Sequence, residues 1–446
     1  MADSLRKTLD ESAMSRFQWI AVSICVILNM LDGFDVLVMA FTAPTVSAEW
    51  GLNGAQLGVL FSAGLVGMAA GSLFLAPQAD RFGRQAIILF SLVLVTIGML
   101  LSGFVDTSFQ LAAMRAITGV GIGGMLAGGT VITAEYSSAR LRSTAVGIQA
   151  LGYPVGATVG GSIAAMLLEH YGWRSVFIFG AAITAAMIPL VLWRLPESVD
   201  FLLTKRPPNA LKKINALLRK MGHPELDQLP PAPAIPTEKR PNAIAGLFAN
   251  GLARQTVLIW AAYFLLMFSF YFAMSWTPKL LVAAGLSAQQ GITGGVLLNV
   301  GGMFGGVLFG VLAPRMSLAR LTGINMAVAS VCMVAFGAVT GSLGAAFAVA
   351  CGIGLFLFAA MGGLYAFAPA IYPAGVRTTG MGWAIGVGRL GAILAPLIAG
   401  VLLDGGWVPA NLYYAFALPL LAAMVAVLAL GRSGKVHAVE GVVAAH

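Results

Sequence analysis

The sequence predicts an all-α integral membrane protein with twelve transmembrane helices, arranged as two six-helix halves with pseudo-twofold symmetry. Three observations predict it: the composition, the lengths of the apolar runs and an internal repeat. Of the 446 residues, 59% are hydrophobic and 10% are charged, whereas an ordinary soluble domain has about 25% charged residues. So few charged residues cannot cover a soluble fold of this length. The composition also argues against a disordered chain, a coiled coil, a secreted disulfide scaffold and a nucleic-acid-binding protein, in spite of the net charge of +9.

Twelve apolar runs are long enough to cross a membrane, since a helix that spans the hydrocarbon core needs ~20 apolar residues. The runs are continuous rather than alternating, which favours helices over the strands of a membrane β-barrel. The predicted spans lie near residues 17–42, 55–76, 85–104, 109–134, 143–168, 174–195, 254–277, 288–312, 318–340, 344–371, 378–402 and 409–430.

The basic residues are distributed unequally between the two sides of these spans. If the N-terminus is cytoplasmic, 22 of the 26 Lys and Arg residues lie on the inner side. Cytoplasmic loops carry such an excess, so both termini are expected to be cytoplasmic. The expected segments are a cytoplasmic N-terminal tail (1–16), an N-terminal six-helix half (17–195), a cytoplasmic central loop (196–253), a C-terminal six-helix half (254–431) and a cytoplasmic C-terminal tail (432–446).

The central loop is rich in proline, so much of it should be irregular. Between the prolines, apolar residues recur at helical spacing from Ala210 to Met221, with Lys and Arg around them. This pattern predicts a short amphipathic helix at the membrane surface. The favoured interpretation of this loop is a basic tether that follows the charge rule for inner loops.

The two halves of the chain repeat each other at a nearly constant offset. Adding 234 maps Gly67 onto Gly301 and Arg81 onto Arg315, and adding 235 maps Glu169 onto Asp404. Parallel repeats of this kind are typical of membrane carriers that work by alternating access. Their substrate site lies near the bilayer midplane at the interface between the repeats.

Four charged residues lie within the predicted spans, where each costs roughly 2.5–3.5 kcal/mol and therefore indicates a functional role. Asp32 and Asp35 are three residues apart and share one helix face. Arg115 enters the membrane from the opposite end of its span, about 9 Å deep at 1.5 Å per residue, and overlaps the two acids in depth. Arg389 lies about 16 Å along its own span, near the midplane.

Two interpretations of the first three charges stay open. They could form a buried ion-paired group that holds helices together. Alternatively, Arg115 neutralises one of the two acids, and the carboxyl group of the other acid carries a proton. Arg389 has no acidic neighbour on its helix or at matching depth in the second half. Its planar guanidinium fits a carboxylate, so we expect Arg389 to bind a substrate carboxylate.

Over nearly its whole length the sequence resembles the major facilitator superfamily. The resemblance rests on Ala76-x3-Asp80-Arg81-Phe82-Gly83-Arg84 between the second and third spans, on Glu135-x6-Arg142, and on Pro196-Glu197-Ser198. Ala76 stands where this superfamily usually has Gly, and Gln85 where it usually has a basic residue. The resemblance implies a gating role for the loop and its neighbours, although basic inner loops are also expected from topology alone. The expected gating residues are Asp80, Arg81, Gly83, Arg84, Glu135 and Arg142.

Within this superfamily the sequence resembles the aromatic acid:proton symporter family. The segments that carry this resemblance are Leu31-Asp32-Gly33-Phe34-Asp35, Tyr372-Pro373-x3-Arg377-x2-Gly380 and Gly388-Arg389-x-Gly391-Ala392. It implies uptake of benzoate-like carboxylates with protons across a bacterial cytoplasmic (inner) membrane, in the service of aromatic catabolism. The sequence does not choose among benzoate, its hydroxylated relatives and longer arylalkanoates.

The resemblance also implies roles for individual residues. It implies that Asp32, Asp35, Arg115 and Arg389 are required. From the residues themselves we expect proton coupling by Asp32 and Asp35, and substrate binding by Arg115 and Arg389. Among the aromatic residues in the spans, Phe34, Tyr365 and Trp383 are candidates for stacking on a substrate ring, although helix packing is the commoner role of such residues. Trp276 lies near the end of a predicted span and is expected to be an anchor at the membrane interface.

Two other functions stay open. Gly156-Ala157-x2-Gly160-Gly161 resembles the motif of drug antiporters but has Ala157 in place of the motif's Pro. A proton-coupled efflux antiporter of drugs or organic anions is therefore one alternative, and a non-transporting membrane sensor of aromatic acids is another. Nucleophile constellations, metal-ligand spacings and phosphate-binding loops are missing from the sequence, so we expect no enzyme activity and no cofactor beyond the coupling proton. The expected partners are a small aromatic carboxylate, protons and membrane lipid, with no nucleic acid, and the chain is expected to be a monomer.

Overall fold

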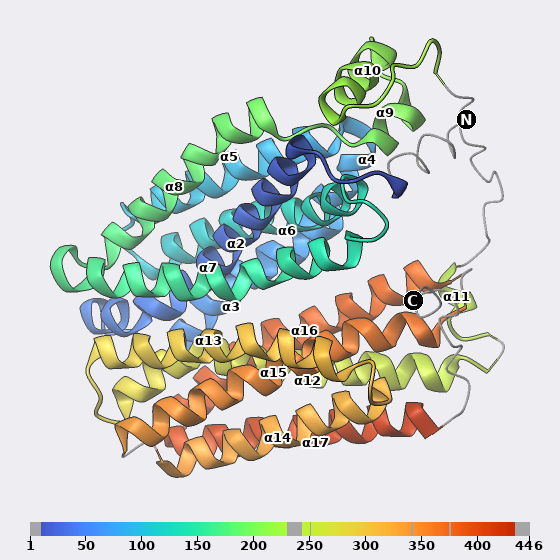
Figure 1. Ribbon diagram of the computed structural model, residues 1–446. Coiled ribbons are helices and arrows are strands. Elements are labelled where there is room, and N and C mark those ends of the chain that lie inside the picture. The colour runs from blue at the N-terminus through green and yellow to red at the C-terminus, as the bar shows by residue number, and fades with distance from the viewer. Residues whose placement is uncertain (1–9, 230–242, 250, 340–341, 374–375, 433–446) are drawn as a thin grey trace. The chain divides into compact units, whose positions relative to one another are not determined.

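The computed structural model describes residues 10–229, 243–249, 251–339, 342–373 and 376–432. All regular elements of these residues are helices, and twelve of them are long and apolar enough to cross a membrane. Figure 1 shows the chain as a series of such helices joined by short connections. Most of the two predicted tails and residues 230–242 of the predicted central loop lie outside the described residues.

The six spans of the N-terminal half are each confirmed, with shifted ends. The second span continues through three short segments, η1 (Gly71–Leu75), η2 (Ala76–Gln78) and α4 (Ala79–Phe82). The first span is longer than predicted, because its helix continues through Pro44 to Trp50. The spans are α2 (Arg16–Trp50), α3 (Gly54–Ala70), α5 (Arg84–Ser102), α6 (Ser108–Glu135), α7 (Arg142–Tyr171) and α8 (Trp173–Arg194).

The six spans of the C-terminal half also agree with the apolar runs. Short helices α9 (Val199–Lys205), α10 (Ala210–Met221) and α11 (Ala243–Gly246) precede them. The spans are α12 (Ala253–Ala283), α13 (Ala288–Leu312), α14 (Leu318–Val339), α15 (Leu343–Ile371), α16 (Arg377–Asp404) and α17 (Pro409–Arg432). The predicted all-α fold with twelve spans is therefore confirmed.

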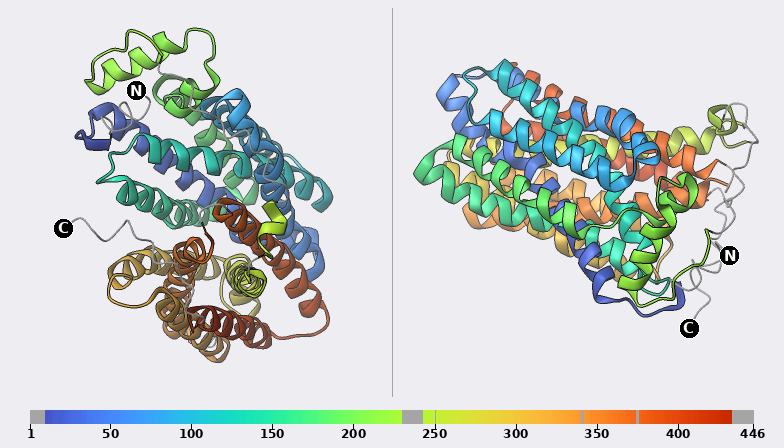
Figure 2. Two further views of the ribbon diagram at one scale, coloured as in Figure 1. Left: turned by 90° about the vertical axis from the view of Figure 1, so that its right-hand side faces the viewer. Right: turned by 90° about the horizontal axis from the view of Figure 1, so that it is seen from above.

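The chain divides into two compact units. The first comprises Met1–Val38, Ala63–Gly160 and His170–Glu238, and the second comprises Met39–Ser62, Gly161–Glu169 and Lys239–His446. The end of α2, the start of α3 and the end of α7 thus group with the C-terminal helices. In both views of Figure 2 the long helices of each unit run roughly alongside one another.

The internal repeat is visible in the packing within each unit. In the first unit, a Cβ atom on Gly67 would overlap the carbonyl oxygen of Ala116, so α3 and α6 touch backbone to backbone. In the second unit, a Cβ atom on Gly301 would overlap the carbonyl oxygen of Cys351, so α13 and α15 also touch backbone to backbone. Both members of the first pair map onto the second at offsets of 234 and 235. Small residues allow such close approach of helices in lipid.

The predicted amphipathic helix of the central loop is present as α10. Its apolar residues, among them Ile214, Leu218 and Met221, are buried in a cluster with Leu202 of α9 and residues at the start of α2. In Figures 1 and 2 α9 and α10 lie beside that end of α2. The prediction that α10 lies with its apolar face on the membrane surface is therefore wrong, because protein covers this face.

Candidate functional site

Helix α2 carries both predicted acids deep inside the first unit. Asp32 and Asp35 are each 2% exposed, and Arg115 of α6 is 3% exposed. Arg115 donates one hydrogen bond to the main-chain oxygen of Asp35 (3.3 Å) and another to the sulfur of Met99 (3.1 Å). Its guanidinium also lies 5.6 Å from the centre of the Phe177 ring.

The carboxylate of Asp35 is not bonded to Arg115. Neither of its oxygens has a hydrogen-bond partner among the described residues, although both are buried. Arg115 contributes its positive charge nearby. A buried carboxyl group without donors is destabilised when ionised, so it can take up and release a proton as its surroundings change.

The two residues between the acids pack α2 against its neighbours. A Cβ atom on Gly33 would overlap the carbonyl oxygen of Tyr153, so only glycine permits this approach of α2 to α7. Phe34 is buried, lies over Gly160 and makes an edge-to-face contact with Phe179 (6.2 Å between ring centres). In this conformation Phe34 is a packing residue, and its stacking on a substrate ring stays a prediction.

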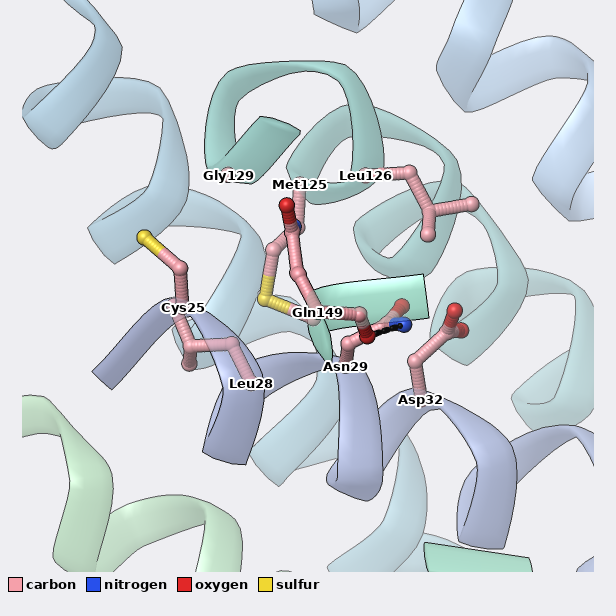
Figure 3. Close-up of a pocket in the computed structure, with 8 residues that line it drawn as sticks. All are labelled: Cys25, Leu28, Asn29, Asp32, Met125, Leu126, Gly129 and Gln149. Atoms are coloured by element: carbon pink, nitrogen blue, oxygen red, sulfur yellow. Dashed lines mark hydrogen bonds between the residues drawn. The ribbon is translucent and has the colours of Figure 1, made fainter. Parts of the chain in front are cut away.

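A small cavity adjoins Asp32 in the first unit. It is bounded by α2, α6 and α7, and its polar lining consists of Asn29, Asp32 and Gln149. The amide nitrogen of Asn29 donates to the main-chain oxygen of Gln149 (2.6 Å). Figure 3 shows the side chains of Asp32 and Gln149 both directed toward α6.

In the second unit, Arg389 occupies the middle of α16. Its guanidinium forms no hydrogen bond or ion pair with any residue that the structure describes, and it acts electrostatically on the hydroxyl of Tyr365 from α15. The neighbouring Gly388 has no side chain, which lets α16 lie against Tyr263 and Met267 of α12. The geometry agrees with the prediction that this cation lacks a protein anion.

Aromatic side chains surround this part of α16. Tyr365 and Tyr263 meet edge to face with ring centres 5.9 Å apart, and Trp383 stacks on Trp260 at 5.6 Å. Tyr365 and Trp383 are 44% and 43% exposed, so the neighbouring residues cover only part of each side chain. Trp276, in contrast, is fully buried and donates to the main-chain oxygen of Pro396 (3.2 Å), so its prediction as an interfacial anchor is wrong.

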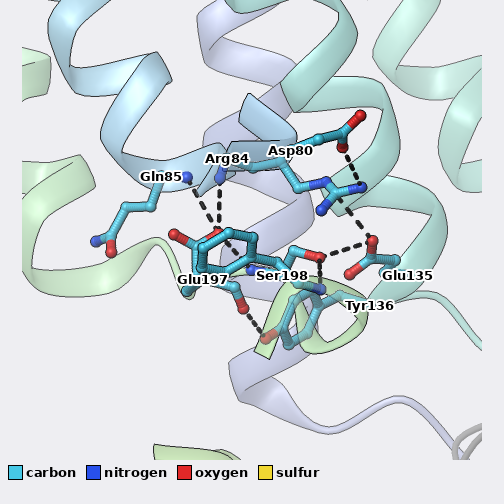
Figure 4. A network of polar contacts seen from close by, with 8 residues as sticks. Asp80, Arg84, Gln85, Glu135, Tyr136, Glu197 and Ser198 are labelled. Carbon is cyan, nitrogen blue, oxygen red and sulfur yellow. Dashed lines mark hydrogen bonds and ion pairs between the residues drawn. The ribbon is translucent and has the colours of Figure 1, made fainter. Parts of the chain in front are cut away.

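The loop motif lies in a polar network of the first unit. Arg84 is 3.3 Å from the carboxylate of Asp80 and 3.9 Å from that of Glu135. The hydroxyl of Ser198 donates to Glu135 at 2.8 Å. Figure 4 shows these groups around the start of α5. The structure thus brings three of the predicted gating residues into direct contact.

Glu197 connects this network to the backbone. Its carboxylate accepts hydrogen bonds from the amides of Arg84 (2.8 Å) and Gln85 (3.3 Å), which are the first two of α5. The hydroxyl of Tyr136 donates to the main-chain oxygen of Glu197 (2.7 Å). Gly83 has φ of 104°, a conformation that favours glycine, and any Cβ there would overlap the Glu197 carboxylate.

The other two predicted gating residues lie outside the contacts of Arg84. Arg142 pairs with Asp10 and donates to the main-chain oxygen of Ala134 (3.0 Å). Arg81 is exposed and lies over the ring of Phe82, 5.2 Å from its centre. Arg142 therefore links the start of α7 to the segment before α2.

The family model described as Major Facilitator Superfamily matches residues 23–384 of this chain. The chain belongs to the Major Facilitator Superfamily. It is 33% identical to the gallate transporter of Pseudomonas putida, and the match covers 95% of this chain and 94% of that protein. It is 30% identical to the 4-hydroxybenzoate transporter PcaK of Pseudomonas aeruginosa, with the same shares covered. The benzoate transport protein of Acinetobacter baylyi is 27% identical, over 90% of this chain and 87% of that protein.

A solved structure of this superfamily has the same fold. The xylose transporter XylE from E. coli, in its inward-open conformation, superposes with a TM-score of 0.71 at 17% identity. The match covers 92% of this chain and 96% of that chain. The resemblance to aromatic-acid transporters of this superfamily, inferred from the motifs, is confirmed. The chain is a multi-pass membrane transporter and not an enzyme.

Three residues of this transporter that line or support the candidate sites were not singled out as functional from the sequence. Gln149 lines the cavity beside Asp32, Tyr263 lies against Gly388 next to Arg389 in sequence, and Glu197 caps α5. Glu197 could have been identified as a functional candidate from the sequence, since it belongs to the Pro196-Glu197-Ser198 segment that resembles the superfamily. Gln149 and Tyr263 are uncharged residues within spans, where only the packing of neighbouring helices reveals their surroundings.

Proposed function

We propose that this transporter is a proton-coupled importer of small aromatic carboxylates, working by alternating access. We place it in a bacterial cytoplasmic membrane with both termini inside. The relatives named for gallate, 4-hydroxybenzoate and benzoate support the substrate class. The distribution of basic residues supports the orientation.

The observation that carries this proposal is the unpaired guanidinium of Arg389 among aromatic side chains. A half-buried cation without a protein anion is costly, and a substrate carboxylate offsets that cost through two parallel hydrogen bonds. Tyr365 and Trp383, on either side in sequence and partly exposed, present rings for contact with the aromatic part of the substrate. Arg389 thus binds the carboxylate, and Tyr365 and Trp383 contact the ring.

Asp35 is the proposed proton carrier, together with Asp32. Its carboxylate is buried without hydrogen-bond donors, and the positive charge of Arg115 lies close by. Import of a monovalent anion into a negative-inside cell works against about 2.3 kcal/mol per 100 mV. One proton carried with each anion cancels this electrical work, so the pH gradient drives accumulation.

The polar network around Arg84 is the proposed inner gate. In its contacts, Arg84 bridges the exposed acid Asp80 and the buried acid Glu135, and these contacts can form and break as the inner ends of the helices move. Ser198 and Glu197 connect the gate to the start of α9 and α5.

Uptake of radiolabelled aromatic acids into cells, with and without an uncoupler, tests this function. The expected result is uptake of several benzoate-type acids that collapses when the proton gradient is removed. Accumulation that survives the uncoupler would rule out proton symport. Uptake only into everted vesicles would indicate the efflux antiporter, and binding without uptake in either orientation would indicate the sensor.

Substitution of Arg389 tests the substrate site directly. Arg389→Gln should abolish uptake of every aromatic carboxylate at unchanged membrane abundance. Arg320→Gln removes the same charge from the exposed start of α14 and should transport normally. Normal transport by Arg389→Gln would exclude this residue as the carboxylate ligand. Asp35→Asn should separate the two steps, because it keeps substrate binding but loses proton-driven accumulation.

A further inference from the structure

Helix α16 contains a glycine near Arg389 whose missing side chain no packing contact explains. A Cβ atom on Gly391 would overlap the carbonyl oxygen of Phe264, so that glycine lets α16 lie against α12. A Cβ atom on Gly386 meets nothing within 4 Å among the described residues, and Gly386 is exposed. Glycine weakens the middle of a helix relative to alanine. Its presence at position 386 therefore indicates a use other than packing within the chain.

Gly386 lies midway between two residues of the proposed substrate site. It comes three residues after Trp383 and three before Arg389, and residues three apart are neighbours on a helix surface. Along the helix axis it is about 4.5 Å from each of them, at 1.5 Å per residue. The Cα–Cβ bond of a helical residue leans toward the N-terminus, so the side chain of Arg389 starts out toward Gly386. A small ligand that contacts both the guanidinium and the indole ring therefore crosses the backbone at Gly386.

The face of α16 that carries Arg389 is covered by protein toward the C-terminal end of the helix. A Cβ atom on Gly400 would overlap the carbonyl oxygen of Gly54 at the start of α3, which belongs to the same compact unit. Gly400 follows Arg389 by eleven residues, about three turns, so the two residues face the same way. At Gly386, one turn before Arg389, no described residue covers the backbone. The face is thus a protein-contacting one that becomes open beside Arg389.

We propose that the ring of the substrate lies on the helix backbone at Gly386, which makes this glycine a specificity-determining residue. The inference rests on the proposed function, in which Arg389 binds the carboxylate and Trp383 contacts the ring. A planar ring joined directly to a carboxylate can lie against the bare backbone between these two side chains. A methyl group at position 386 would lift the ring from the backbone and draw the carboxylate away from the guanidinium.

Uptake kinetics of stepwise larger variants provide the first test, with benzoate, 4-hydroxybenzoate and gallate as probes. Gly386→Ala should raise the KM of each transported probe about tenfold, the order expected when one methyl group overfills a close contact. Gly386→Val should abolish saturable uptake.

Gly382→Val is the matched control for these variants. Gly382 is also exposed on α16, and a Cβ atom there meets nothing within 4 Å among the described residues. It lies outside the stretch between Trp383 and Arg389, however. Gly382→Val should therefore keep a KM within about twofold of the wild-type value, as for an ordinary surface substitution.

Thermal unfolding in detergent separates a ligand contact from a role in folding. Gly386→Ala should be at least as stable as wild type, because the added methyl group meets open space and alanine is the better helix former. The best-transported probe, at one fixed concentration, should raise the unfolding temperature of wild type and of Gly382→Val, but much less that of Gly386→Val. A Gly386→Ala protein less stable than wild type would assign Gly386 a packing role and overturn the inference.

The remaining outcomes distinguish this inference from the proposed function. Wild-type KM values in Gly386→Val would overturn the inference, while aromatic-acid import stands. Equal loss of uptake in Gly386→Val and Gly382→Val would also overturn it, because the effect would then not depend on the position between Trp383 and Arg389. If the wild-type protein takes up none of the three probes, the proposed function fails and the inference fails with it.

Discussion

Replacing Glu197 by alanine removes the acceptor for the first amides of α5. In the structure its carboxylate receives hydrogen bonds from Arg84 and Gln85, at 2.8 and 3.3 Å. It also accepts from the amide of Ser198 at 2.8 Å. The first amides of a helix have no partners within the helix, so a capping oxygen is their main source of hydrogen bonds.

The magnitude follows from these contacts. Loss of a capping side chain costs about 1 kcal/mol, and loss of a negative charge at a helix N-terminus costs a further 0.3–1 kcal/mol or so. Glu197→Ala loses both contributions, about 2 kcal/mol in local stability. Glu197→Gln keeps a side-chain oxygen and loses only the charge, about 0.5–1 kcal/mol. The two changes correspond to roughly 30-fold and 2- to 5-fold faster local opening, at tenfold for each 1.4 kcal/mol.

Hydrogen exchange followed by mass spectrometry measures this opening in the purified protein. A peptide that covers residues 84–88 reports on the first turn of α5, because amide exchange there requires its hydrogen bonds to open. The expected order of exchange rates is wild type, then Glu197→Gln, then Glu197→Ala. Glu225→Ala is the control, because Glu225 pairs with Arg219 in an exposed contact of the same unit.

Two results would refute this reasoning. If Glu197→Ala leaves exchange in residues 84–88 at the wild-type rate, the carboxylate does not hold these amides in solution. If Glu197→Gln exchanges as fast as Glu197→Ala, the acceptor oxygen contributes nothing, and only the charge matters. A faster rate in the Glu225→Ala control would show that the effect is not specific to the start of α5.

Two further substitutions test close contacts within each unit. Gly33→Ala forces α2 away from α7 and should lower the free energy of unfolding by about 1–3 kcal/mol, measured as reduced thermal stability in detergent. Gly147→Ala is the control, because a Cβ atom there meets open space and should leave the stability unchanged. Equal stability of the two variants would contradict the close packing at Gly33. Asp404→Asn weakens the hydrogen bonds that this carboxylate accepts at the start of α3, one of them from the amide of Gly54 (2.6 Å). Hydrogen exchange of the amides at the start of α3 should become about fivefold faster. This factor corresponds to the loss of about 1 kcal/mol from a negative charge at a helix N-terminus. Exposed Asp106→Asn should leave this exchange unchanged, and an unchanged rate in Asp404→Asn would disprove the capping role.

The spans and the charges within them could be predicted from the sequence, because a membrane span requires a long apolar run and a charged residue stands out within such a run. A run of apolar residues has few alternatives to a membrane helix, and Asp32, Asp35, Arg115 and Arg389 interrupt such runs. The exact ends of the helices could not be predicted from the apolar runs. The first span was predicted to end near residue 42, yet α2 continues through Pro44 to Trp50.

Partners of individual side chains could not be predicted. Arg115 was expected to neutralise an acid through its carboxylate, but it bonds the main-chain oxygen of Asp35 instead. Trp276 lies near a span end, where an interfacial position is common, yet α16 supplies a carbonyl oxygen that holds it inside. The side-chain oxygen of Gln149 is buried without a hydrogen-bond partner among the described residues, which depends on how three helices pack together. Hydropathy and charge along one chain contain no information on such contacts between helices.

Under the proposed function, the sum of the four charges predicted within the spans explains how proton and substrate are coupled. With both acids ionised, Asp32, Asp35 and Arg115 contribute a net charge of −1, and Arg389 contributes +1, so the empty protein carries no net charge at these positions. A proton alone leaves +1, and a substrate carboxylate alone leaves −1. Binding of both restores zero. Because an uncompensated charge in a low-dielectric interior costs several kcal/mol, the singly loaded forms are disfavoured in any state closed to water, whereas the empty and doubly loaded forms are not. Under the proposed function, this balance of charges couples one proton to each monovalent aromatic carboxylate without requiring direct contact between proton and substrate.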